Sequence, residues 1–76
     1  MDKVLAILQQ VRADVDFVNE KELIDNGILN SFDIVAIVSE LSEAFDITIT
    51  VDNLIPENFN SAEAIHALVE KILDEE

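Results

Sequence analysis

Hydrophobic residues recur with helical spacing in three segments of this 76-residue chain, at positions 2 to about 13, 31–45 and 60–74. In each segment they return every three or four residues, which places them on one face of an α-helix. The three faces consist of Val4, Leu5, Ile7, Leu8 and Val11; Ile34, Ile37, Val38, Leu41 and Phe45; and Ile65, Leu68, Val69, Ile72 and Leu73. We expect three amphipathic helices that pack these faces together.

The first connecting segment, residues 14–27, shows no sustained period, and we expect an ordered loop there. Its apolar residues are spaced as anchors on the core: Phe17, Val18, Leu23 and Ile24. A short helical turn is expected around residues 21–24. Gly27 is the only glycine, so we expect it to adopt a backbone angle that other residues disfavour. A long irregular connection in a compact domain is more often functional than passive.

Residues 45–51 alternate apolar and polar side chains and are rich in β-branched residues, so local propensity favours a strand. A strand needs a pairing partner, and the sequence offers none. We therefore expect an extended connector that inserts three side chains into the bundle: Ile47, Ile49 and Val51. The only proline can open a short helix over residues 56–59. Asn60 or Ser61 is expected to cap the last helix, with Glu63 placed either for a capping box with Asn60 or to favour the helix dipole.

The composition supports a helical domain. One glycine and one proline argue against a β architecture with many turns, and half of the residues are apolar. We expect residues 1–76 to form a single all-α domain, a small bundle of three main helices and one short helix. We also expect a monomer.

The charge of the chain restricts its partners. Seventeen acidic residues against four basic ones give a net charge of −13, which opposes binding to nucleic acid and favours basic partners. No apolar stretch approaches the length of a membrane span, and the N-terminus lacks a signal-type segment. We expect a cytoplasmic protein that does not span a membrane.

Residues for catalysis or metal binding are scarce. The chain has no cysteine and no tyrosine, and His66 is its only histidine, so no nucleophile–base arrangement is available and we expect no enzymatic activity. We expect His66 to be a surface or half-buried side chain. The carboxylates Asp14, Asp16 and Asp25 lack the fixed offsets of a helix–loop–helix calcium site, so we expect no metal site.

The boundary between the first loop and the second helix contains the most informative residue, Ser31. A serine directly before an amphipathic segment can cap the helix, because its hydroxyl accepts a hydrogen bond from an unpaired amide. The same hydroxyl would lie beside the positive end of the helix dipole, where a phosphate is well tolerated. Both roles are compatible with the sequence.

The residues around Ser31 resemble the attachment motif of the phosphopantetheine-dependent carrier proteins, which include acyl, peptidyl and D-alanyl carrier proteins. In that family a serine, usually within Asp-Ser-Leu or Asp-Ser-Phe, begins the second helix, and the match here is Asn30-Ser31-Phe32. The resemblance covers essentially the whole chain, through Gly27-Ile28-Leu29, Phe45-Asp46-Ile47 and Glu57-Asn58-Phe59-Asn60-Ser61. It implies an acyl-carrier-protein-like fold.

The resemblance also implies a function. Ser31 would carry a covalent 4′-phosphopantetheine, transferred from coenzyme A by a phosphopantetheinyl transferase. The thiol of this group would hold an acyl or aminoacyl cargo as a thioester, loaded by an activating ligase and used by an acyltransferase or synthase. The exposed side of the second helix would dock these enzymes through Asn30, Phe32, Asp33, Ala36, Ser39, Glu40 and Glu43.

Several alternatives stay open on the sequence. Phe32 can contact a partner or fold back onto the loop as a hydrophobic staple. Asn30 replaces the usual aspartate and removes a charge from the neighbourhood that a general transferase reads. The length of the first loop and the presence of Phe32 look more like D-alanyl and aminoacyl carriers than like the carrier of fatty acid synthesis. The competing hypothesis is a small acidic helical interaction module without a prosthetic group, in which Ser31 only caps the helix.

Overall fold

The computed structural model describes residues 2–75 and confirms an all-α architecture. Over this range the chain forms helices and connecting turns, and no strand. In order, the elements are α1 (Asp2–Val11), α2 (Ser31–Phe45), the 3₁₀ turn η1 (Val51–Asn53), α3 (Pro56–Phe59) and α4 (Ala62–Glu75). The three long helices lie within two residues of the bounds that the hydrophobic period predicts, and the short helix at residues 56–59 is also confirmed.

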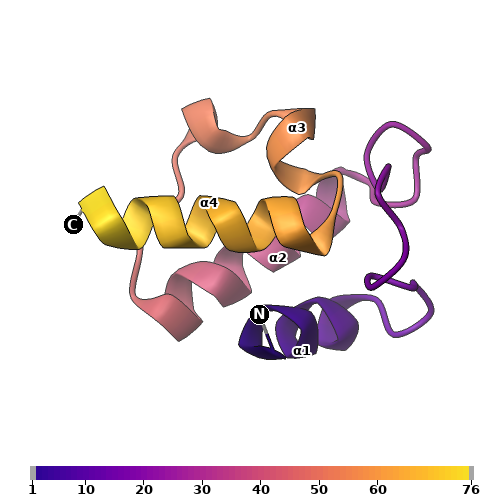
Figure 1. Cartoon of the computed structure of the whole chain (residues 1–76), viewed down its shortest axis with the longest axis horizontal. Helices are drawn as coiled ribbons and strands as arrows, with labels where there is room; N and C mark the ends of the chain where they lie inside the picture. The colour runs from indigo at the N-terminus through magenta and orange to yellow at the C-terminus, as the bar shows by residue number, and fades with distance from the viewer. Residues whose placement is uncertain (1, 76) are drawn as a thin grey trace.

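The helices form a small bundle in which α4 crosses in front of α2 and α1 lies beside them (Figure 1). α1 contacts both α2 and α4, and α3 packs against α4. The first connection loops around one end of this bundle, between the end of α1 and the start of α2 (Figure 1). Within residues 2–75, no helix combines the length and the apolar composition that crossing a membrane requires.

The core combines the apolar faces of the long helices with anchors from the connections. Its buried members are Val4, Ile7, Leu8, Phe17, Leu23, Leu29, Ile37, Leu41, Ile47, Phe59, Ala62, Ile65, Leu68, Val69 and Ile72. Phe17 and Leu23 are confirmed as buried anchors of the first connection, whereas Val18 is 58% exposed and the expectation for it is wrong. Burying a side chain of this size contributes roughly 1.5–3 kcal/mol. The irregular connection is therefore an integral part of the core.

Asn60 fastens the first connection to the far end of the chain. Its backbone carbonyl accepts the amide of Leu23 at 2.9 Å, and its side-chain oxygen accepts the amides of Ile24 and Asp25 at 3.0 and 3.1 Å. The helical turn expected around residues 21–24 lies slightly further along, because the Asn26 amide donates to the Glu22 carbonyl and the Gly27 amide to the Ile24 carbonyl, each at 2.9 Å. These bonds bring a segment without regular structure against the start of α4.

Ser61 rather than Asn60 caps α4, because its hydroxyl accepts the amide of Ala64 at 3.0 Å. The capping box expected for Glu63 is wrong, since the Glu63 carboxylate instead pairs with Lys21 from the first connection. Asn60 and Glu63, which were both candidates for capping α4, thus hold the first connection instead.

The segment after α2 is an extended connector, as expected, and not a strand. Asp46 ends α2 in the left-handed region with a φ of 54°, and its amide donates to the Ser42 carbonyl. Ile47 is buried and Ile49 half-buried, but Val51 is 82% exposed because it begins η1. The expectation that Val51 inserts into the bundle is therefore wrong.

Gly27→Ala tests the turn that leads to Ser31. Gly27 has a φ of +69°, and a Cβ there would meet no heavy atom within 4 Å. The cost of the substitution is therefore backbone strain alone, and we expect the free energy of unfolding to fall by about 1 kcal/mol. Urea denaturation followed by circular dichroism measures it. Gly27→Asn should lose less, because asparagine tolerates this region, and equal losses for both variants would contradict the argument.

Candidate functional site

Ser31 is the first residue of α2, but it does not cap the helix. The cap is Asn30, which has an extended backbone, and whose side-chain oxygen accepts the Asp33 amide at 2.9 Å. The Asp33 carboxylate accepts the Asn30 amide in return at 3.1 Å, which completes a capping box. Of the two roles that the sequence leaves open for the Ser31 hydroxyl, helix capping is therefore performed by Asn30 instead.

The hydroxyl of Ser31 is available for chemistry. The residue is exposed, and across residues 2–75 its hydroxyl takes part in no hydrogen bond. Over the same part of the chain, the amides of Ser31 and Phe32 find no acceptor either, because the capping box uses only the amides of Asn30 and Asp33. Unpaired amides at a helix start form the positive end of the helix dipole and favour an anion. The exposed Ser31 hydroxyl thus lies directly beside two backbone amides that have no acceptor within residues 2–75.

Arg12 is a residue of the site that the sequence interpretation missed. One guanidinium nitrogen, Nη1, donates to the Asp33 carboxylate at 2.6 Å and to the Ile28 carbonyl at 3.2 Å. The Nε and Nη2 atoms donate to the two carboxylate oxygens of Asp14, each at 2.9 Å. Arg12 is the only arginine among four basic residues, and this was the signal that could have identified it.

The contact between Arg12 and Asp14 shifts the pKa of both groups. The hydrogen bonds from Arg12 lower the pKa of Asp14 from 3.8 to about 2. The bonds to Asp14 and then Asp33 raise the pKa of Arg12 further above its ordinary value. Asp33 was expected to dock partners, but its side chain is only 13% exposed and is shared between Arg12 and the helix cap. Its carboxylate is committed to holding the loop and the helix together.

The other predicted docking residues are accessible to different degrees. Phe32 is 86% exposed, so it does not fold back onto the loop as a staple. Asn30, Ser39, Glu40 and Glu43 are exposed as well, and Ala36 is half-buried. From Phe32 onward these positions are three or four residues apart and share one side of α2. Val35 is 68% exposed and adds a second apolar side chain beside Ser31.

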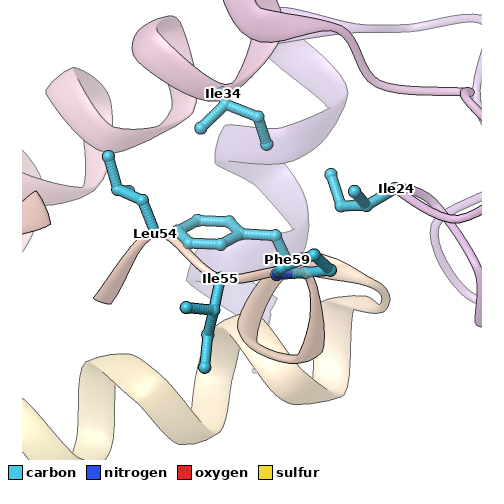
Figure 2. Close-up of a pocket in the computed structure, with 6 residues that line it drawn as sticks. Ile24, Ile34, Leu54, Ile55 and Phe59 are labelled. Carbon is cyan, nitrogen blue, oxygen red and sulfur yellow. The ribbon is translucent and has the colours of Figure 1, made fainter. Parts of the chain in front are cut away.

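A shallow hollow lies next to Ser31. It is lined by Ile24, Leu29, Asn30, Ser31, Ile34, Val35 and Leu54. Three of these residues, Ile24, Ile34 and Leu54, also line a neighbouring apolar pocket of about 110 Å³, which Ile55, Pro56 and Phe59 complete. In Figure 2 the Ile34 side chain points from α2 toward the Phe59 ring, with Leu54 and Ile24 on either side. The surface beside the hydroxyl therefore leads into an apolar recess.

His66 is half-buried, as expected, with its side chain 31% exposed. Its Nε2 atom lies 3.1 Å from the carboxylate of Glu70, one helical turn further along α4. Within residues 2–75, no three histidine, cysteine or acidic residues are grouped so that they could hold a metal ion.

Asn30→Ala and Ser31→Ala distinguish the two candidate caps. Asn30→Ala leaves the Asp33 amide without its acceptor, and we expect the free energy of unfolding to fall by about 1 kcal/mol. Ser31→Ala removes no hydrogen bond, so we expect a change of at most a few tenths of a kcal/mol, since alanine also favours a helix. Urea denaturation of both variants in one buffer measures the difference. A loss near that of Asn30→Ala in Ser31→Ala would show that the hydroxyl is the cap.

The Asp14 ion pair predicts a difference in acid stability. The folded-state pKa of Asp14 is lowered, so the pair stabilises the fold fully above the ordinary pKa of 3.8, and this contribution is lost as the pH falls through about 2. We therefore expect the wild type to lose more stability than Asp14→Asn between about pH 4 and pH 2. Urea midpoints at several pH values measure the loss. Asp52→Asn, at an exposed position in η1, controls for net charge, and parallel curves for Asp14→Asn and the wild type would contradict the assignment.

Comparison with protein-family models found no match to this chain. A search of curated proteins found no significant match, and a search of solved structures found none.

Proposed function

We propose that this protein is a carrier that holds an acyl or aminoacyl group as a thioester on a 4′-phosphopantetheine arm attached to Ser31. The observation that carries the proposal is the exposed Ser31 hydroxyl, which makes no hydrogen bond within residues 2–75 while its neighbour Asn30 caps the helix. If the serine served only as a cap, its hydroxyl would accept a hydrogen bond from an amide of the first helical turn. Here capping and presentation of a hydroxyl belong to two adjacent residues.

The attachment step is a phosphoryl transfer from coenzyme A. The Ser31 Oγ atom attacks the phosphorus that bears the pantetheine arm, and an O–P bond forms. The bond from that phosphorus to the bridging oxygen of the pyrophosphate breaks, and adenosine 3′,5′-bisphosphate leaves with the electron pair. A base of the transferase takes the hydroxyl proton, because no titratable side chain of this chain hydrogen-bonds to the hydroxyl within residues 2–75.

The residues around Ser31 fit a phosphodiester with an amphipathic arm. The free amides of Ser31 and Phe32 and the helix dipole favour the negative phosphate, by about 0.3–1 kcal/mol at an exposed helix start. Ile34, Val35 and Leu54 line the adjacent hollow and can contact the arm. When bound, the group supplies the thiol that carries the cargo, which agrees with a chain that has no cysteine.

The exposed side of α2 is proposed to dock the enzymes that load and unload the carrier. Phe32 and Val35 offer an apolar contact next to Ser31, and Glu40 and Glu43 follow on the same helix as exposed carboxylates. In a chain with a net charge of −13, these carboxylates would steer a basic surface toward the apolar contact. The proposed partners are a phosphopantetheinyl transferase, an acyl- or aminoacyl-activating ligase, and an acyltransferase or synthase.

Asn30 in place of the family's usual aspartate is compatible with this proposal. Aspartate and asparagine are about equally good caps, and the Asn30 side chain makes the capping bond that either residue could make. The substitution therefore preserves the presentation of Ser31 and changes only the local charge. An aminoacyl or D-alanyl cargo is the one that the sequence motif favours.

Modification by a transferase tests the proposal. We expect incubation with coenzyme A and a broad-specificity phosphopantetheinyl transferase to increase the intact mass by one phosphopantetheine, as measured by mass spectrometry. The increase should be absent in Ser31→Ala and present in Ser42→Ala, a control at another serine of α2 that is not among the proposed docking residues.

If the wild type is not modified, Asn30→Asp is tested under the same conditions. Modification of Asn30→Asp alone would indicate a dedicated transferase that accepts asparagine. Failure of both proteins to be modified would overturn the carrier proposal in favour of an interaction module without a prosthetic group.

A further inference from the structure

The two ends of the segment that contains Ser31 are held by one side chain, Arg12. The segment leaves the first connection at Ile28 and enters α2 with the turn that contains Asp33. Arg12 Nη1 bonds to the Ile28 carbonyl and to the Asp33 carboxylate, three residues before and two residues after Ser31. One nitrogen atom therefore fixes the exit of the loop relative to the entrance of the helix.

The guanidinium is itself held in place. Its other two nitrogens bind both oxygens of Asp14, so its plane cannot rotate without breaking this paired contact. The Asp33 oxygen that Arg12 binds is also the one that accepts the Asn30 amide at 3.1 Å. A continuous path of hydrogen bonds thus runs from Asp14 through Arg12 and Asp33 to Asn30, the residue next to the serine.

Other hydrogen bonds hold the two sides of the segment separately: the amides of Ile28 and Leu29 donate to the Leu23 carbonyl, and the capping box joins Asn30 to Asp33. Leu29 is buried between the two bonded positions, but Gly27, Asn30, Ser31 and Phe32 are all exposed and no packing around them defines their orientation. The charge of Asp33 would also be unfavourable beside the many other carboxylates of this chain without its cation. Among the side-chain bonds within residues 2–75, those of Arg12 join Ile28 directly to Asp33. They therefore restrain the exit of the loop relative to the start of α2, and with it the direction in which the Ser31 hydroxyl is presented.

We infer that Arg12 is a positioning residue for the modification of Ser31, and that it acts through Asp33 and the Ile28 carbonyl rather than by contact with coenzyme A. This inference rests on the proposed carrier function. A displacement of about 1 Å at a reacting atom can reduce a rate by up to about a hundredfold. Loss of Arg12 should therefore slow the transfer step and leave the docking side of α2 unchanged.

Arg12→Gln and Lys21→Gln form a matched pair for the test. Each variant removes one positive charge. Arg12→Gln removes the ion pairs with Asp14 and Asp33, whereas Lys21→Gln removes the pair with Glu63, at the start of α4. We expect Arg12→Gln to lower the kcat of modification by a broad-specificity transferase about tenfold, with the KM for the carrier within about twofold of wild type. Lys21→Gln should leave both constants unchanged. Intact-mass time courses at several carrier concentrations give kcat and KM.

A conservative variant separates charge from geometry. Arg12→Lys keeps the net charge and can reach one carboxylate, but it cannot bind Asp14, Asp33 and a carbonyl at once, so we expect only partial recovery, to about threefold below wild type. Full recovery by lysine would show that charge alone matters. A rise in KM with unchanged kcat in Arg12→Gln would show contact with the transferase. Either result would overturn the positioning role.

Two further measurements keep the outcomes distinct. If circular dichroism shows that Arg12→Gln does not fold, Asp14→Asn is used instead, because it releases the guanidinium plane but leaves the Arg12–Asp33 bond possible. A kcat equal to that of wild type in Asp14→Asn would then overturn the inference. A modified wild type with equal kcat values for Arg12→Gln and Lys21→Gln refutes the inference alone. Failure of both the wild type and Asn30→Asp to be modified refutes the carrier function and the inference with it.

Discussion

The structure depends on anchoring a long irregular connection between the first two helices. Phe17, Leu23 and Leu29 from this connection are buried among the helices, and Asn60 binds three of its backbone amides. Without these contacts, α1 and α2 would be joined by a flexible loop, and the position of Ser31 would not be defined. A small domain buries only about 60% of the surface that its unfolded chain exposes. The buried residues of the connection therefore add apolar burial that the helices alone cannot provide.

Because the chain has many more acidic than basic residues, each of its few cations strongly affects the local electrostatics. Three of the four basic residues link segments that are distant in sequence: Lys3 lies over the Phe45 ring and donates to the Ala44 carbonyl, Arg12 joins Ile28 to Asp33, and Lys21 pairs with Glu63. Exposed ion pairs are individually weak. In a molecule with a net charge of −13, however, they also determine where carboxylates can approach one another.

At the start of α2 the chain divides two tasks between neighbouring residues. Asn30 satisfies the helix end, and Ser31 is left with an exposed hydroxyl beside unpaired amides. The apolar recess on one side and the exposed Phe32 on the other give this hydroxyl surroundings suited to an attached arm and to a docking partner. In the proposed function, the chemistry belongs to the enzymes that the carrier visits.

The sequence by itself determined the helices, because their hydrophobic period is a local property, and it identified Gly27 and Ser31 by their uniqueness and position. It also correctly rejected a strand at residues 45–51, since a single strand has no partner. Only the tertiary structure decided that Asn30 and not Ser31 caps α2, because both residues have capping side chains and the choice follows from the backbone angle of one of them. Likewise, the bond between Arg12 and Asp33 joins residues 21 positions apart in the sequence. It forms because the first connection folds onto the core, and no local sequence pattern encodes that folding.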